Sequence, residues 1–144
     1  MSADIFIPAR TSGHGQFTVD IDHEKAGWGY SGLRVVELEA GASQALETGD
    51  SELLVLPLAG SATVNVDGHD YELAGRPGVF QAVTDYLYVG RGKELTITSA
   101  AGGRFAFPSA VASKDLPTAY YPKETVRIDL RGAGDCSRQV NNYC

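Results

Sequence analysis

Three histidines, at positions 14, 23 and 69, are the side chains best suited to act as a general base in this sequence. A Ser/His/Asp or Cys/His catalytic set requires a histidine held beside the nucleophile. His14 lies between two glycines, and His23 lies in a charged stretch. His69 directly follows Asp67-Gly68, a dipeptide typical of hairpin turns. We therefore expect all three histidines on the surface, and nucleophilic catalysis is not favoured.

The sequence lacks the histidine spacing that is usual in protein metal sites. A barrel metalloenzyme commonly presents two histidines at positions i and i+2 of one strand, where both point to the same face. This chain has no His-x-His. Cys136 and Cys144 have no histidine near them to complete a zinc site, and we expect both to be free thiols. Residues 47–52 have two interpretations: they form either a carboxylate-only site for a hard cation or an ordinary polar loop.

Two further patterns have ordinary structural explanations. Residues 90–93 combine glycine and basic residues, but a strand is expected after them, so no helix N-terminus can bind a phosphate there. Aromatic residues at strand spacing are more typical of a core than of a ligand pocket. They are Phe80, Tyr86, Tyr88, Phe105 and Phe107.

The elements that must position these side chains are strands, because apolar and polar residues alternate along most of the chain. Glycine contributes 17 of the 144 residues and marks many turns. Short strands with turn signals between them predict a sandwich or barrel. The predicted strands are residues 33–38, 52–58, 62–66, 69–73, 86–89, 94–98, 104–108 and 125–130.

Composition restricts the possible partners. The net charge of −6 argues against nucleic acid, whose affinity comes largely from basic residues. No apolar run is long enough to cross a membrane, and Met1–Asp4 does not resemble a signal peptide, so we expect a cytoplasmic protein.

Most of the basic residues lie in the second half of the chain. The stretch from Lys123 to Arg138 is either a solvated surface or, with Arg127, Arg131 and Arg138, a docking segment.

Two segments resemble the cupin sequence motifs in spacing. Cupins place a His-x-His pair and a glutamate between two glycines, and a further histidine in Pro-x-Gly-x-x-His. The first frame runs from Gly41 to Gly60 in this chain. The ligand positions hold Glu47, Gly49, Leu53 and Leu95. The resemblance implies an all-β cupin (RmlC-like) double-stranded β-helix, or jelly-roll barrel. Because leucine suits a dry core, we expect no metal in this barrel.

Longer segments give a narrower resemblance. The most specific are Leu46–Glu52 and the Gly-x-Gly-x-Cys-Ser-Arg-Gln-Val sequence of residues 132–140, with Gly27–Val36 and Tyr88–Gly92 in support. The chain is similar over essentially its whole length to the 5-deoxy-glucuronate isomerase family of bacterial myo-inositol catabolism, and more distantly to 4-deoxy-5-keto-uronate isomerases. Those proteins are bicupins. Residues 1–144 are thus expected to form a single cupin domain that resembles the N-terminal one, with Asn141–Cys144 where the family passes into its second cupin.

The family reaction is the aldose–ketose isomerisation of 5-deoxy-D-glucuronate to 2-deoxy-5-keto-gluconate. It needs an acid–base pair and a divalent metal to polarise the carbonyl. The resemblance places the metal ligands in the second cupin. This half is therefore expected to carry no cofactor and no catalytic residue, to be inactive alone, and to have a structural, interface-forming role. Its expected partners are the second cupin domain, further copies in a homo-oligomer, or both. The sugar acid would bind only in the complete enzyme, and neither nucleic acid nor a membrane is expected.

Two alternatives remain. A stand-alone, metal-free cupin would bind a small carbohydrate or organic acid in an open polar pocket, with Glu47, Tyr86 and Tyr88 as first candidates to line it. A dimerisation module would instead show an exposed apolar patch. The interior near Leu53 and Leu95 discriminates between these hypotheses, because a filled core there argues against a ligand pocket.

Overall fold

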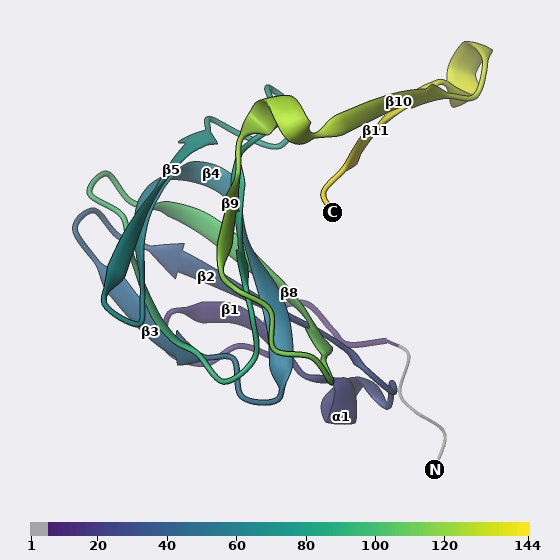
Figure 1. Ribbon diagram of the computed structural model, residues 1–144. Coiled ribbons are helices and arrows are strands. Elements are labelled where there is room, and N and C mark those ends of the chain that lie inside the picture. The colour runs from purple at the N-terminus through teal and green to yellow at the C-terminus, as the bar shows by residue number, and fades with distance from the viewer. Residues whose placement is uncertain (1–5) are drawn as a thin grey trace.

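The computed structural model describes residues 6–144, so the Met1–Asp4 segment used in the targeting argument lies outside it. Almost all of the regular structure is strand (Figure 1). The strands are β1 (Phe17–Ile21), β2 (Ser31–Leu38), β3 (Ser43–Glu47), β4 (Ser51–Val66), β5 (His69–Arg76), β6 (Tyr86–Val89), β7 (Glu94–Thr98), β8 (Gly103–Val111), β9 (Ala119–Tyr121), β10 (Arg127–Arg131) and β11 (Arg138–Asn142). The helix α1 (His23–Ala26) and the 3₁₀ turns η1 (Lys123–Thr125) and η2 (Gly134–Cys136) are short. Within the described part, no helix is long and apolar enough to cross a membrane.

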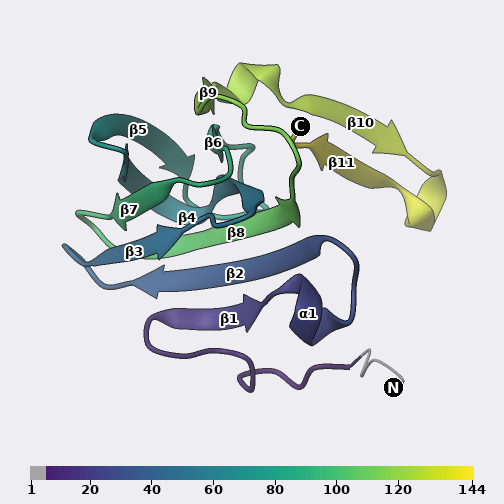
Figure 2. The ribbon, with the colours of Figure 1, turned by 60° about the horizontal axis from the view of Figure 1, so that its bottom comes forward.

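Two groups of antiparallel strands share the long strand β4 (Figure 2). One group runs in the order β1-β2-β8-β4-β6-β9. In the other, β7 lies between β3 and the second half of β4, and β5 pairs with that same half. This arrangement confirms the predicted all-β cupin fold. It corrects one detail, because residues 52–58 and 62–66 form a single strand whose register shifts near Gly60.

The core lies between these two groups of strands. Alternate residues of each strand point inward, as the period of two requires. Phe105 and Phe107 of β8 are fully buried, as expected of core aromatics, whereas Phe80 is fully exposed and lies outside the core. The cluster is filled by aliphatic residues from both groups of strands, among them Val36, Leu46, Leu53, Val55, Val64, Leu73, Leu87, Val89, Leu95 and Ile97.

The Asp67-Gly68 hairpin has the predicted geometry. Both residues have positive φ, 48° and 87°, which a type I′ turn requires. The side chain of Asn65 closes the turn by accepting a hydrogen bond from the Gly68 backbone N–H at 3.1 Å. His69, the first residue of β5, is exposed, as the sequence predicted.

Beyond β9 the chain leaves the barrel. Strands β10 and β11 pair only with each other and form a two-stranded arm, residues 127–142, that projects from the barrel (Figures 1 and 2). The predicted strand at 125–130 therefore exists, but it belongs to this arm rather than to the barrel. Most of the basic stretch between Lys123 and Arg138 also lies in the arm.

Candidate functional site

The four positions that align with cupin metal ligands do not face a common cavity. Leu53 on β4 and Leu95 on β7 are each 2% exposed and belong to the same hydrophobic cluster. Glu47 is an exposed residue at the end of β3, and Gly49 lies in the turn that follows. Two of the four positions thus lie in the hydrophobic core, and the other two lie at the surface. An apolar core of this kind cannot solvate a cation, so these residues do not fit a metal site.

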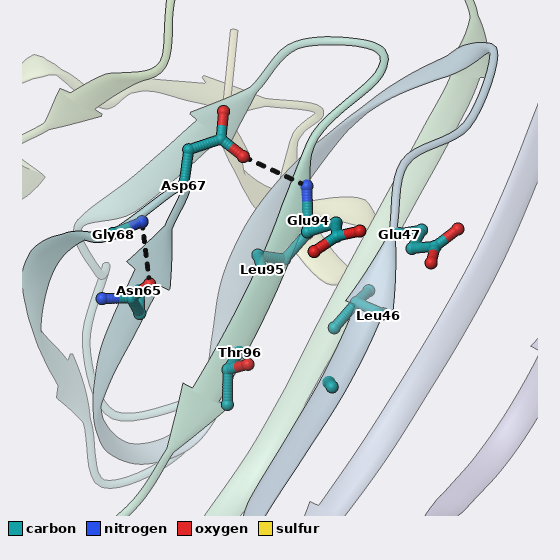
Figure 3. Close-up of a pocket in the computed structure, with 9 residues that line it drawn as sticks. Leu46, Glu47, Asn65, Asp67, Gly68, Glu94, Leu95 and Thr96 are labelled. Carbon is teal, nitrogen blue, oxygen red and sulfur yellow. Dashed lines mark hydrogen bonds between the residues drawn. The ribbon is translucent and has the colours of Figure 1, made fainter.

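Glu47 lines a pocket of about 360 Å³ on the barrel surface (Figure 3). It is paired across the strands with Glu94 of β7, so two carboxylates lie on neighbouring strands. The rest of the pocket is Ala45, Leu46, Asn65, Asp67, Gly68, Leu95 and Thr96. Figure 3 shows the Glu47 side chain pointing away from Asp67. The pocket offers hydrogen-bond acceptors but no imidazole or thiol for catalysis.

Asp67 of this pocket is already engaged. Its Oδ2 atom lies 2.9 Å from the Lys93 Nζ atom, and its Oδ1 atom accepts a 3.4 Å hydrogen bond from the Glu94 backbone N–H. The contact with Lys93 lowers the pKa of Asp67, and the same contact raises the pKa of Lys93. Both groups therefore stay charged at neutral pH and form an ion pair. Such a pair is suited to holding the hairpin turn closed and not to transferring a proton.

Tyr86 and Tyr88 lie on a different part of the molecule from Glu47. Both are on β6, whose inward-facing residues are Leu87 and Val89. The two tyrosines therefore point to the outer side of that strand. The structure does not bring the three predicted pocket residues together.

The two tyrosines have well-defined partners. The Tyr88 hydroxyl donates to Glu52 Oε2 at 2.6 Å, and burial together with this hydrogen bond raises the pKa of Tyr88 to about 12. Tyr86 stacks on Tyr121, with ring centroids 4.9 Å apart, and its hydroxyl accepts from the Cys144 backbone N–H at 3.2 Å. Both rings thus help to hold neighbouring segments in place.

A buried carboxylate, Asp85, organises the base of the arm. Only 3% of Asp85 is exposed, and it accepts hydrogen bonds from the backbone N–H groups of Ala74 (2.8 Å) and Gly75 (2.9 Å). The Thr84 hydroxyl is 3.2 Å from Oδ1, and the Tyr120 hydroxyl of β9 donates to Oδ2 at 2.8 Å. Two backbone N–H groups and the Tyr120 hydroxyl thus donate to this buried carboxyl group, and the Thr84 hydroxyl, which also lies 3.0 Å from the Asp85 carbonyl oxygen, is within reach of it.

Arg76, which is also buried, forms a second set of contacts in addition to those of Asp85. Its Nε atom donates to the Pro57 carbonyl oxygen at 2.9 Å, and Nη1 donates to the Ala82 carbonyl oxygen at 3.0 Å. Nη1 also donates to the Tyr143 hydroxyl at 3.2 Å, and the guanidinium carbon lies 5.8 Å from the Tyr143 ring centroid. Arg76 therefore connects the barrel to the residues that return from the arm.

Four residues of these contacts were not predicted from the sequence: Arg76, Asp85, Tyr120 and Tyr143. The only local signal was the position of Asp85, a lone carboxylate directly before the apolar strand at 86–89. An isolated charged residue beside a buried strand needs hydrogen-bond partners, but these come from segments far apart in the sequence. The alternation of apolar and polar residues does not identify them.

Charged residues cover one face of the arm. Asp129 lies 2.8 Å from Arg127 Nη2 and 3.3 Å from Arg131 Nη2. The hydrogen bond from Arg127 lowers the pKa of Asp129, so this cluster stays charged. The other face carries Ile128 and Leu130, both exposed. The arm thus presents apolar side chains opposite its ion pairs.

The remaining candidates stay on the surface. His14 is exposed and lies 3.2 Å from Asp20, while His23 begins α1. Cys136 and Cys144 are free and exposed. In the portion of the chain that the structure describes, no group of three or more His, Cys, Asp and Glu side chains is placed to hold a metal ion.

Comparison with known sequences gives a consistent result. A sequence model of the KduI/IolB family matches residues 5–144. The 5-deoxy-glucuronate isomerase of Geobacillus kaustophilus is 28% identical over 140 residues, which cover 96% of this chain and 51% of that protein. The one from Shouchella clausii is 30% identical over 125 residues, covering 85% and 46%. The chain thus spans about half the length of the curated relatives it matches.

Comparison with solved structures extends this result. An IolB-like protein from Salmonella typhimurium LT2 superposes with a TM-score of 0.85 at 28% identity, over 94% of this chain and 52% of that one. A cupin protein from Bacteroides fragilis superposes with a TM-score of 0.52 at 16% identity, over 78% of this chain and 92% of that one, and supports the fold alone. The match to half of a longer protein therefore holds in three dimensions as well as in sequence.

Proposed function

This chain belongs to the KduI/IolB family, and we propose that it is the N-terminal, non-catalytic half of a two-cupin 5-deoxy-glucuronate isomerase. The single observation that carries the proposal is the filled interior, where Leu53 and Leu95 occupy metal-ligand positions. The half-length matches to proteins of that name support the substrate assignment. The proposed reaction is aldose–ketose isomerisation in inositol degradation, carried out in the cytoplasm by the complete enzyme.

An aldose–ketose isomerase must move a proton between adjacent carbons while it stabilises an enediolate. That chemistry requires an acid–base pair and an electrophile at the carbonyl oxygen. The barrel interior contributes aliphatic and aromatic side chains, which can do neither. We therefore assign no catalytic step to this half, and we place the divalent metal and the acid–base groups in the second cupin.

The role left to this half is structural. Its barrel is closed by a packed core, and its arm is fixed to the barrel through the buried contacts of Asp85 and Arg76. Such a unit can hold a partner domain in a defined orientation. This role agrees with a chain that aligns with only one half of its relatives.

An isomerase assay tests the proposal. The 144-residue chain is incubated with 5-deoxy-D-glucuronate and Mn²⁺ or Zn²⁺, and the ketose product is measured. The same assay is applied to a chimaera in which residues 1–144 precede the second half of the Geobacillus kaustophilus enzyme. We expect turnover by the chimaera and none by the chain alone. Turnover by the chain alone at a rate like that of the chimaera would refute a non-catalytic half.

A stand-alone carbohydrate or organic-acid binder is the alternative. Such a protein would gain thermal stability with a sugar acid, by ~2.7 kcal/mol at 100 times the dissociation constant. Because the interior is filled, a surface pocket such as the one at Glu47 would have to supply that binding. A thermal-shift panel of uronates therefore separates the two functions, and we expect no shift for the chain alone.

A further inference from the structure

One sheet of the barrel is apolar on both of its faces. Its strands β2, β8, β4 and β6 send one set of residues into the core, including Leu53 and Val55. The next residue along each strand points the opposite way. The resulting outer face includes Leu33, Leu54, Leu56, Tyr88, Pro108 and Ala110, together with the buried Val35 and Ala106.

The strand register makes these residues neighbours. Leu33 pairs with Pro108, and Leu54 pairs with Tyr88. Leu56 pairs with Ala106, a small residue that is itself buried. Directly paired residues project to the same side of a sheet, so these side chains form one continuous apolar surface across four strands.

Charged residues lie at the two ends of this outer face. Glu52 at one end accepts the 2.6 Å hydrogen bond from Tyr88. Glu37 of β2 and Arg104 of β8, which are directly paired, lie at the other end. A groove of about 240 Å³ runs over the face, lined by Leu54, Tyr88, Pro108, Ala110 and their neighbours. An antiparallel sheet that met water on this side would alternate apolar and polar residues, whereas β4 reads Leu-Leu-Val-Leu-Pro-Leu from residue 53. The face is therefore built to be covered.

The polypeptide itself reaches this face. After the arm, Cys144 returns to the barrel, where its backbone N–H donates to Tyr86 and the residue lines the same groove. Figure 1 shows this end of the chain in the angle between the arm and the barrel. The chain covers 51% of one matched relative and 52% of a matched solved structure, so about as much chain again lies outside the match. If this chain is the N-terminal half, as proposed above, the second half would start beside this face.

We infer that the outer face, flanked by the arm, is the docking surface for the second cupin half. This inference rests on the proposed function and adds the place of contact to it. Two sheets that pack face to face lie about 10 Å apart and bury apolar side chains between them, which the composition of the outer face allows. The exposed Leu130 and Ile128 of the arm would extend the contact at its side.

Hydroxyl-radical footprinting of the chimaera described above tests the inference. We expect Leu54 and Tyr88 to be oxidised several-fold more slowly in the chimaera than in the 144-residue chain. Leu54→Glu in the chimaera should restore fast oxidation of Tyr88, because a buried carboxylate would push the two halves apart. Leu116→Glu is the matched control, since Leu116 is exposed beside Asp115 and Lys93 in a pocket next to β5.

The outcomes separate the inference from the proposed function. Equal oxidation of Leu54 and Tyr88 in both proteins, in a chimaera that turns over substrate, overturns the docking surface and leaves the function intact. If the outer face is protected in a chimaera that is inactive, the docking surface is supported and the proposed isomerase function is refuted. If the isolated chain sediments as a dimer with the face already protected, a second copy is the occupant and the inference is wrong. Leu56→Glu repeats the test from the next position if Leu54→Glu does not fold.

Discussion

Tyr120 on β9 donates its hydroxyl to the buried carboxylate of Asp85, 2.8 Å away. The same carboxylate binds the backbone of β5 at Ala74 and Gly75. One buried charge therefore joins the last strand of the barrel to a strand nearly fifty positions earlier in the sequence. β9 leads through η1 into the arm, so this pair holds in place the strand from which the arm departs.

Removing the Tyr120 hydroxyl should destabilise the fold. Tyr120→Phe leaves Asp85 with one donor fewer, and we expect the free energy of unfolding to fall by about 1.5–3 kcal/mol, the usual contribution of a hydrogen bond to a charged group. Tyr121→Phe keeps the ring that stacks on Tyr86 and should change that free energy by less than about 0.5 kcal/mol. Urea unfolding measures both. Equal effects would show that Tyr120 does not anchor β9 through Asp85.

Alkaline pH should weaken the fold through two tyrosines. The pKa of Tyr88 and that of Tyr120 are each raised to about 12 in the folded chain, against 10.0 for an ordinary tyrosine. The folded state thus holds these protons more tightly. Their stabilisation is complete below pH 10 and is lost as the pH rises toward 12. Urea unfolding across this range should show a shallower loss in Tyr88→Phe and Tyr120→Phe than in a Tyr30→Phe control.

Gly75 should be far less replaceable than Gly92, although their φ angles are 68° and 69°. A Cβ atom on Gly75 would overlap the carbonyl oxygen of Gly60 on β4, whereas one on Gly92 meets open space. Gly92→Ala should cost only the left-handed strain, about 1–2 kcal/mol. Gly75→Ala should add a backbone shift that also disturbs Asp85, and it should lower the urea midpoint much further. Similar midpoints for the two variants would contradict the close approach of β4 and β5.

Leu53 and Leu54 should respond differently to truncation. Leu53→Ala opens a cavity in the core, and we expect a loss of about 2–5 kcal/mol in the free energy of unfolding. Leu54→Ala truncates a half-buried side chain on the outer face and should cost about 1 kcal/mol. Chemical unfolding of the isolated chain measures both. A larger loss for Leu54 would mean that the outer face of this sheet is the packed one.

The fold could be predicted from the sequence because alternation and turn chemistry are local. The strands at 86–89 and 94–98 were found with their observed bounds, and Asp67-Gly68 formed the expected turn. Strands at 17–21, 43–47, 119–121 and 138–142 were missed. No residue of the segments at 119–121 and 138–142 is buried, so their alternation carries little signal. Pairing with β6 and β10 defines them as strands.

The candidate site was less predictable than the fold. The spacing of the cupin frame singled out Leu53 and Leu95, and both belong to the hydrophobic cluster of the core. Tyr86 and Tyr88 were linked to Glu47 by residue type alone. Glu47 is exposed at the end of β3, whereas Tyr86 on β6 is only 4% exposed and Tyr88 is half-buried. The contacts of Arg76 with Tyr143 and of Asp85 with Tyr120 span 67 and 35 positions of sequence, which no local pattern encodes.

We propose that aliphatic side chains, Leu53 and Leu95 among them, take the place of metal ligands inside this barrel. Crystals of the 144-residue chain soaked with Mn²⁺, and measured for anomalous scattering, test it most directly. We expect no anomalous peak in the interior between Leu53 and Leu95. A peak in the barrel within coordination distance of Glu47 would contradict the account.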